Sequence, residues 1–160
     1  MKRIALSLLV LVAGPAYAQA TSTAAAISGI ATTGAIWEDG AGYILKAAEQ
    51  MPEADYAYKP TEAVRSFGQL IGHVAGSQYM FCAAGMGETP RAEEDIEKSV
   101  TSKAGLIAAL KASDDYCRRA YKQSDSQTAG GITLFGQKST KMYALILNAT
   151  HISEHYGNIV

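Results

Sequence analysis

Apolar residues recur at helical spacing in four separate segments of this 160-residue chain. Apolar residues that recur every three, four or seven positions indicate an amphipathic helix with one buried face. The first apolar row is Ile30, Trp37, Ala41, Ile44, Ala48 and Met51. Pro52 ends this helix because proline cannot continue one. The second helix begins where Ser66 and Gln69 have the form of a capping box, and it ends at Gly85 and Gly87.

Two further helices follow along the chain. Ser102 caps the third, whose apolar row is Leu106, Leu110, Cys117 and Tyr121. The fourth starts at about Ser139, and its row includes Leu145, Asn148, Ile152, His155 and Ile159. Four such helices must bury their apolar rows on one another. We therefore expect an all-α fold, a four-helix bundle with long interhelix loops, over residues 29–160.

Two of the predicted loops are long. Residues 88–99 are polar and charged around Pro90, which is typical of a solvated loop. Residues 124–138 contain three glycines and are not expected to form a regular element throughout, although 132–135 could pack as a short apolar plug. No segment has a competing strand period. The apolar row of the last helix runs up to Val160 without a capping glycine, which is typical of a helix that continues further.

The first residues have the pattern of a secretory signal peptide. Lys2 and Arg3 precede an apolar run, and small residues lead up to Ala18. The run is shorter than the ~20 residues of a spanning helix. We predict cleavage after Ala18, a flexible tether over 19–28, and an exported protein of the periplasm or the exterior. Without Lys2 and Arg3, 12 basic residues stand against 15 acidic ones, which does not favour a nucleic-acid partner.

All three histidines fall within two of the predicted helices. His151 and His155 are four residues apart, so both rings project from one face and can reach a single ion. His73 lies at the border of the apolar row of the second helix. A single histidine is more often a packed residue than a ligand. Because all three lie on inward rows, we predict that they bind a divalent metal and leave one position open for water or substrate.

Several polar residues near the histidines are candidates for supporting the site. Asn148 lies one turn before His151 and could orient an imidazole through its second nitrogen. Gln69 and Ser77 flank His73 and either line the site or are ordinary polar residues at a helix border. Glu154 is either the general base of a reaction or a solvent-facing carboxylate.

Cys82 and Cys117 are the only cysteines. In an exported protein such a pair predicts a disulfide, and the alternative is two buried free thiols on facing helices. Cys82 lies nine residues after His73, on the opposite side of the same helix, so it is a poor candidate for a metal ligand.

The chain resembles the DinB/YfiT-like proteins, especially their exported members. The stretches that carry the resemblance are 58–60, 65–74, 78–82, 148–151 and 154–158. The resemblance implies a four-helix bundle in which His73, His151 and His155 bind a divalent metal, commonly zinc or nickel. It also implies thiol-dependent transferase or isomerase chemistry with a low-molecular-weight thiol as cosubstrate. Export separates the protein from cytosolic thiols, so hydrolysis by an activated water has equal weight.

Three classes of function remain. The first is a metal-dependent transferase or hydrolase acting on a small molecule in the cell envelope, and this is the class we favour. The second is a non-catalytic metal-binding protein, and the third is a structural helical bundle whose histidines only pack. The expected partner is a small-molecule substrate, with no membrane span after signal cleavage. A homodimer stays open as an alternative.

Cleavage of the signal peptide predicts a defined mature terminus. Mass spectrometry of the protein extracted from the cell envelope should find a chain that begins at Gln19, because residues 1–18 are removed during export. A soluble cytosolic protein that retains Met1 or Lys2 would contradict this prediction.

Overall fold

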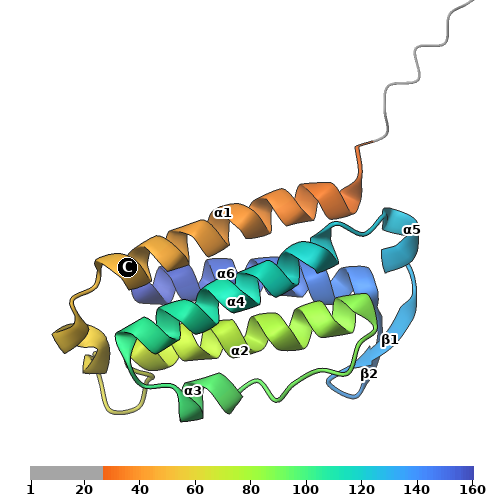
Figure 1. Cartoon of the computed structure of the whole chain (residues 1–160). Helices are drawn as coiled ribbons and strands as arrows, with labels where there is room; N and C mark the ends of the chain where they lie inside the picture. Colours follow the sequence, from red (N-terminus) through yellow and green to blue (C-terminus); the bar gives the residue numbers. More distant parts are fainter. Residues whose placement is uncertain (1–26) are drawn as a thin grey trace, which may run out of the picture.

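The computed structural model describes residues 27–160. The predicted signal peptide, 1–18, and residues 19–26 of the predicted tether lie outside this part of the chain. Four long helices dominate it: α1 (Gly29–Gln50), α2 (Phe67–Met86), α4 (Lys103–Tyr121) and α6 (Lys141–Ile159). They lie side by side as a bundle (Figure 1), as the sequence predicts. Smaller elements connect them: η1 (Glu53–Ala57), α3 (Asp95–Ser99), α5 (Asp125–Thr128), β1 (Gly131–Leu134) and β2 (Gln137–Thr140).

Capping residues fix the ends of the long helices. The capping box predicted at Ser66 and Gln69 is present, with both of its reciprocal hydrogen bonds formed. At the other end of α2, Gly87 adopts a left-handed conformation, with φ 78°, in which glycine avoids the strain of a Cβ atom. Ser102 caps α4 as predicted, and Thr140 caps α6. These caps satisfy backbone groups that would otherwise lack partners.

The bundle has a simple arrangement of neighbours. α1 packs on α4 and α6, and α2 packs on the same two helices from the other side. α2 and α6 run in opposite directions, so the middle of one lies against the middle of the other (Figure 1). Where α1 meets α6, Gly40 leaves room for the Ile152 side chain, whose Cγ2 atom lies 2.4 Å from where a Cβ would be. Trp37 of α1 stacks on Tyr121 of α4, with ring centroids 4.8 Å apart.

α2 is buried on almost every side, and its polar side chains find partners inside the bundle. Gln78, which is fully buried, accepts a hydrogen bond from Trp37 Nε1 at 2.8 Å. Its amide nitrogen donates to Asp114 Oδ1 at 2.7 Å and to Ser113 Oγ at 2.9 Å. One glutamine thereby links α2 to both α1 and α4.

The connection between α2 and α4 differs from the solvated loop predicted over 88–99. This segment contains the short helix α3, and it runs back along α2 in direct contact with it (Figure 1). The contact is close because Gly72 and Gly76 have no side chains. A Cβ on Gly76 would lie 1.8 Å from the Glu93 carbonyl oxygen, and one on Gly72 would lie 2.8 Å from Glu97 Cα.

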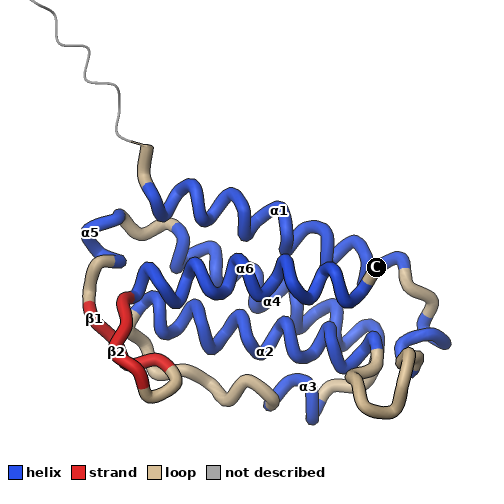
Figure 2. The backbone as a smooth tube through the Cα atoms, turned by 180° about the vertical axis from the view of Figure 1, so that it is seen from behind, coloured by secondary structure: helices blue, strands red, loops and turns tan. Residues whose placement is uncertain are grey.

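The connection before α6 also differs from the prediction, which had no strand. β1 and β2 form an antiparallel hairpin at the end of the bundle where α2 ends and α6 begins (Figure 2). Its turn residues Phe135 and Gly136 both have positive φ, the pattern of a tight two-residue hairpin turn. Leu134 is buried in a small cluster with Phe81 and Ala144, so part of the predicted apolar plug does pack. Phe135 itself is 66% exposed.

Within residues 27–160, none of the helices combines the length and apolar character that crossing a bilayer would require.

Candidate metal centre

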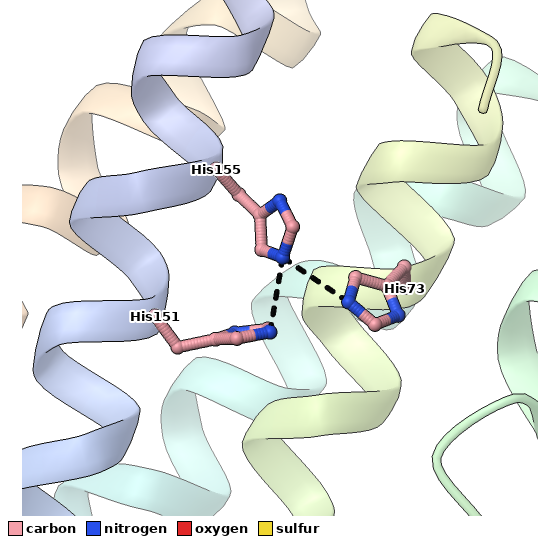
Figure 3. A group of neighbouring side chains, drawn as sticks. All are labelled: His73, His151 and His155. Carbon is pink, nitrogen blue, oxygen red and sulfur yellow. Dashed lines mark hydrogen bonds between the residues drawn. The ribbon is translucent and has the colours of Figure 1, made fainter. Parts of the chain in front are cut away.

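The three histidines meet between α2 and α6. His73 projects from α2, and His151 and His155 project from successive turns of α6 (Figure 3). The Nε2 atom of His155 lies 3.1 Å from Nε2 of His73 and 3.0 Å from Nε2 of His151. One nitrogen from each ring lies within 4.8 Å of the other two. The geometry therefore brings together all three residues that the sequence predicts as ligands.

The site is removed from water, which sets the protonation of the rings. His73 is 6% exposed and His155 is 8% exposed, and His151 is half-buried. Burial lowers the pKa of all three imidazoles, because a charged ring loses hydration there. For His151, burial and the neighbouring His155 and His73 lower the pKa to about 3. The rings are therefore neutral near pH 7, the form in which an imidazole nitrogen can bind a metal.

The ring nitrogens fit a divalent cation better than they fit one another. A neutral imidazole has only one N–H, so facing Nε2 atoms compete for hydrogen atoms, whereas one cation can accept all their lone pairs at once. Zinc–nitrogen bonds of about 2.0–2.1 Å at tetrahedral angles would separate two ligand nitrogens by roughly 3.3 Å. The two observed separations of 3.0 and 3.1 Å are close to that value. Three imidazoles suit zinc, nickel, copper or iron rather than magnesium or calcium.

Groups on the outer side of the rings were missed from the sequence. Asn158 lies with its amide nitrogen 3.3 Å from Nδ1 of His155. The carboxylates of Glu93 and Glu97 lie 3.6 and 3.7 Å from Nδ1 of His73. Asn158 is three residues after His155, a helical spacing that could have revealed it. No local spacing relates Glu93 or Glu97 to His73.

Asn148, a candidate from its spacing for orienting an imidazole, instead contacts the groups around the disulfide. Its row on α6 faces the disulfide between Cys82 and Cys117, whose Cα atoms are 5.3 Å apart. The Asn148 amide nitrogen lies 3.4 Å from Cys82 Sγ and 3.2 Å from the Tyr121 hydroxyl. Both cysteines are fully buried. Asn148 therefore connects α6 to the disulfide that joins α2 and α4.

Gln69 and Ser77 also contact other groups than the imidazoles. The Gln69 side chain is used in the capping box, where its Oε1 accepts from Ser66 N at 2.8 Å, although it still lines the groove described below. Ser77 donates to Glu93 Oε1 at 2.5 Å, so it acts on His73 only through that carboxylate.

Glu154 lies exposed on α6, and within residues 27–160 its side chain forms no hydrogen bond or ion pair. Its exposure agrees with the solvent-facing alternative of the two that the sequence left open, although its charge acts to raise the pKa of His73 and His155. Within residues 27–160, no contact of Glu154 supports its alternative role as the general base of a reaction at the three histidines.

A groove of about 700 Å³ opens beside the histidines, and His155 and Asn158 form part of its wall. The other lining residues come from the connection before α2, the start of α2, and α3: Lys59, Pro60, Glu62, Ala63, Val64, Arg65, Gln69, Leu70 and Glu97. The wall combines apolar surface with charged groups. A small molecule in this groove would lie against His155, the one member of the three histidines that lines it.

A family model described as the DinB superfamily matches residues 37–159, which include all three histidines. The chain belongs to the DinB superfamily. Among solved structures, the DinB-like protein YjoA from Bacillus subtilis is 20% identical, with 80% of this chain and 86% of YjoA covered and a TM-score of 0.63. YfiT from Bacillus subtilis is 18% identical, with coverages of 84% and 87% and a TM-score of 0.63.

YfiT is described as a probable metal-dependent hydrolase with an unusual four-helix bundle topology. At such low identity the two DinB structures establish the shared fold alone. No curated protein matches the chain significantly.

The lowered histidine pKa values predict how the stability of the metal-free DinB fold varies with pH. An ordinary histidine titrates near 6.5, and His151 in the folded chain titrates near 3. Between these values the unfolded chain binds the proton and the folded chain does not. The free energy of unfolding should therefore fall as the pH drops from about 6.5, by at most about 1.4 kcal/mol per pH unit for this one proton.

Urea unfolding of the chelator-treated protein at about pH 7.5 and about pH 4.5 measures this effect. Because other groups also titrate, the informative quantity is the difference between wild type and His151→Gln. The wild type should lose more stability on acidification than the variant. Equal losses in the two proteins would show that His151 is not held neutral by burial.

Proposed function

We propose that this DinB-superfamily protein is a divalent-metal-dependent enzyme, a hydrolase or a thiol-using transferase, that acts on a small molecule in the cell envelope. The observation that carries the proposal is the convergence of three neutral imidazole nitrogens beside an open groove. Catalytic metal sites typically have three protein ligands and one free position, whereas structural zinc sites are closed by four.

Each residue of the site has a distinct task in this proposal. His73, His151 and His155 would hold the ion, and zinc or nickel is the metal we propose. When bound, such an ion supplies a Lewis acid that lowers the pKa of a water or a thiol and makes it nucleophilic near neutral pH. The side-chain amide of Asn158 lies beside Nδ1 of His155. For Nε2 of that ring to be free to bind the ion, the amide oxygen must face Nδ1 and accept its hydrogen bond. The same site serves both reactions, which differ only in the nucleophile.

The groove supplies the binding surface for the substrate. Arg65 and Lys59 lie at its edge, and each is already paired with a carboxylate, Glu97 at 3.0 Å and Glu62 at 3.0 Å. Val64 and Leu70 add apolar surface. Because these basic residues are paired with carboxylates, the groove does not favour a substrate of one charge sign. We therefore propose a small substrate with both polar and apolar parts.

The proposed envelope location rests on the sequence and on the disulfide. The basic start, apolar run and small residues up to Ala18 are typical of an export signal. A buried disulfide persists in oxidising compartments such as the periplasm and is rare in the cytosol. Both features favour a protein that folds after export.

Removal of a single histidine should weaken metal binding strongly. His73→Ala removes the only ligand from α2, and His151→Ala removes one of the two from α6. Either change should weaken zinc binding by more than about a hundredfold, beyond the usual effect of losing an outer partner of a ligand. Competition with a chromophoric chelator measures the affinity, and elemental analysis of protein purified from its own compartment identifies the native metal.

Glu154→Gln is the matched control on the same helix. Because Glu154 is exposed and forms no hydrogen bond or ion pair with the three histidines, this variant should keep both the zinc affinity and the activity of the wild type. Activity is assayed with ester and amide substrates and with thiol–acceptor pairs. An enzyme function is contradicted if metal-loaded wild type never exceeds His73→Ala in these assays. A binding function alone would then remain.

A further inference from the structure

The outer nitrogen of His73 is an exception in a well-satisfied helix. His73 Nδ1 is buried, and no hydrogen-bond partner lies within reach of it. A buried N–H without an acceptor costs roughly 1–3 kcal/mol, so such an atom calls for an explanation. Two carboxylate oxygens lie just beyond hydrogen-bond distance: Glu93 Oε1 at 3.6 Å and Glu97 Oε2 at 3.7 Å.

Both carboxylates are themselves held in place. Glu93 Oε1 accepts from Ser77 Oγ at 2.5 Å, one turn along α2 from His73. Both oxygens of Glu97 accept from Arg65 Nε, at 3.0 and 3.1 Å. The Glu97 side chain is only 13% exposed and that of Glu93 27% exposed, unlike the neighbouring Glu94 at 55%. Glu93 and Glu97 are therefore oriented toward α2, whereas Glu94 is an ordinary surface residue.

The close approach of these two residues depends on glycine. Gly72 and Gly76 lie on α2 directly before His73 and three residues after it. Any side chain on Gly76 would collide with the Glu93 backbone, and one on Gly72 would collide with that of Glu97. Only a helix surface without side chains at these two positions lets the acidic segment lie against the ring of His73.

We propose that Glu93 and Glu97 are positioning residues of the metal centre. Their carboxylates accept from the N–H at Nδ1 of His73 and so leave its Nε2 lone pair facing His151 and His155. The inference rests on the proposed metal-binding function. The physical reason is the tautomer: a neutral imidazole carries one hydrogen, and two adjacent carboxylates favour its position on Nδ1. A carboxylate behind a histidine fixes the ring and makes its other nitrogen a better ligand.

The decisive variant is the double substitution Glu93→Ala with Glu97→Ala. Zinc affinity, measured by chelator competition, should fall by about 10- to 100-fold, the usual effect of removing outer partners of a ligand. The double substitution Glu93→Gln with Glu97→Gln retains an acceptor oxygen at each position and should recover part of that loss. Glu94→Ala, in the same segment, is the matched control and should bind zinc as the wild type does.

A second readout reports the tautomer directly. The chain contains three histidines, all in the site, so ¹⁵N spectra of protein labelled at the histidine ring nitrogens contain signals from these rings alone. In the metal-free wild type, His73 should carry its hydrogen on Nδ1. The double alanine variant should lose this preference and the double glutamine variant should keep it. Far-UV circular dichroism establishes that each variant is folded.

Gly76→Ala tests the same inference without touching either carboxylate. It should displace Glu93 and weaken zinc binding in the same direction. Gly42→Ala is its control, because a Cβ there meets nothing within 4 Å. The inference is overturned if the double alanine variant binds zinc as tightly as wild type or retains the Nδ1 hydrogen. If wild type binds no zinc, the proposed function fails, and the tautomer of the metal-free protein still decides the inference.

Discussion

The burial of α2 on nearly all sides is the constraint on which the rest of the structure depends. α4 and α6 cover two of its faces, and η1 and α3 cover the remainder. A polar side chain on such a helix cannot reach water and must find a partner in the protein. Gln78 has three, in Trp37, Ser113 and Asp114, and Ser77 has Glu93. His73 meets two more imidazoles and two carboxylates, an environment suited to a cation.

The contacts that hold α2, α4 and α6 together lie some distance along the bundle from the histidines. The disulfide joins α2 to α4, and Asn148 of α6 contacts its Cys82 sulfur and the Tyr121 hydroxyl. Cys82 lies nine residues beyond His73 on α2, about 13 Å along the helix axis. The three helices are thus held together at one level while the groove opens at another. A rigid support of this kind favours a site whose ligands are already in place before an ion binds.

The sequence predicted what depends on local pattern. The helical period of the apolar rows, the capping box at Ser66 and the break at Pro52 are short-range signals, and they gave the bundle. The four-residue spacing of His151 and His155 predicted two of the three candidate ligands. The hairpin was missed because its turn holds Phe135, a residue for which positive φ is uncommon. Glu93 and Glu97 were missed because their contact with α2 spans a loop. The spacing of Gly68, Gly72 and Gly76 on one face of α2 was the available signal that another segment packs there.

We propose that His73, His151 and His155 hold one divalent ion through their Nε2 atoms. X-ray absorption spectroscopy of the mature protein with one equivalent of zinc tests it most directly. Binding by the three Nε2 atoms predicts a first shell of nitrogen and oxygen at about 2.0–2.1 Å, with the outer scattering of three imidazoles and one further light ligand. A sulfur shell near 2.3 Å, or a signal that fits fewer than two imidazoles, would contradict it.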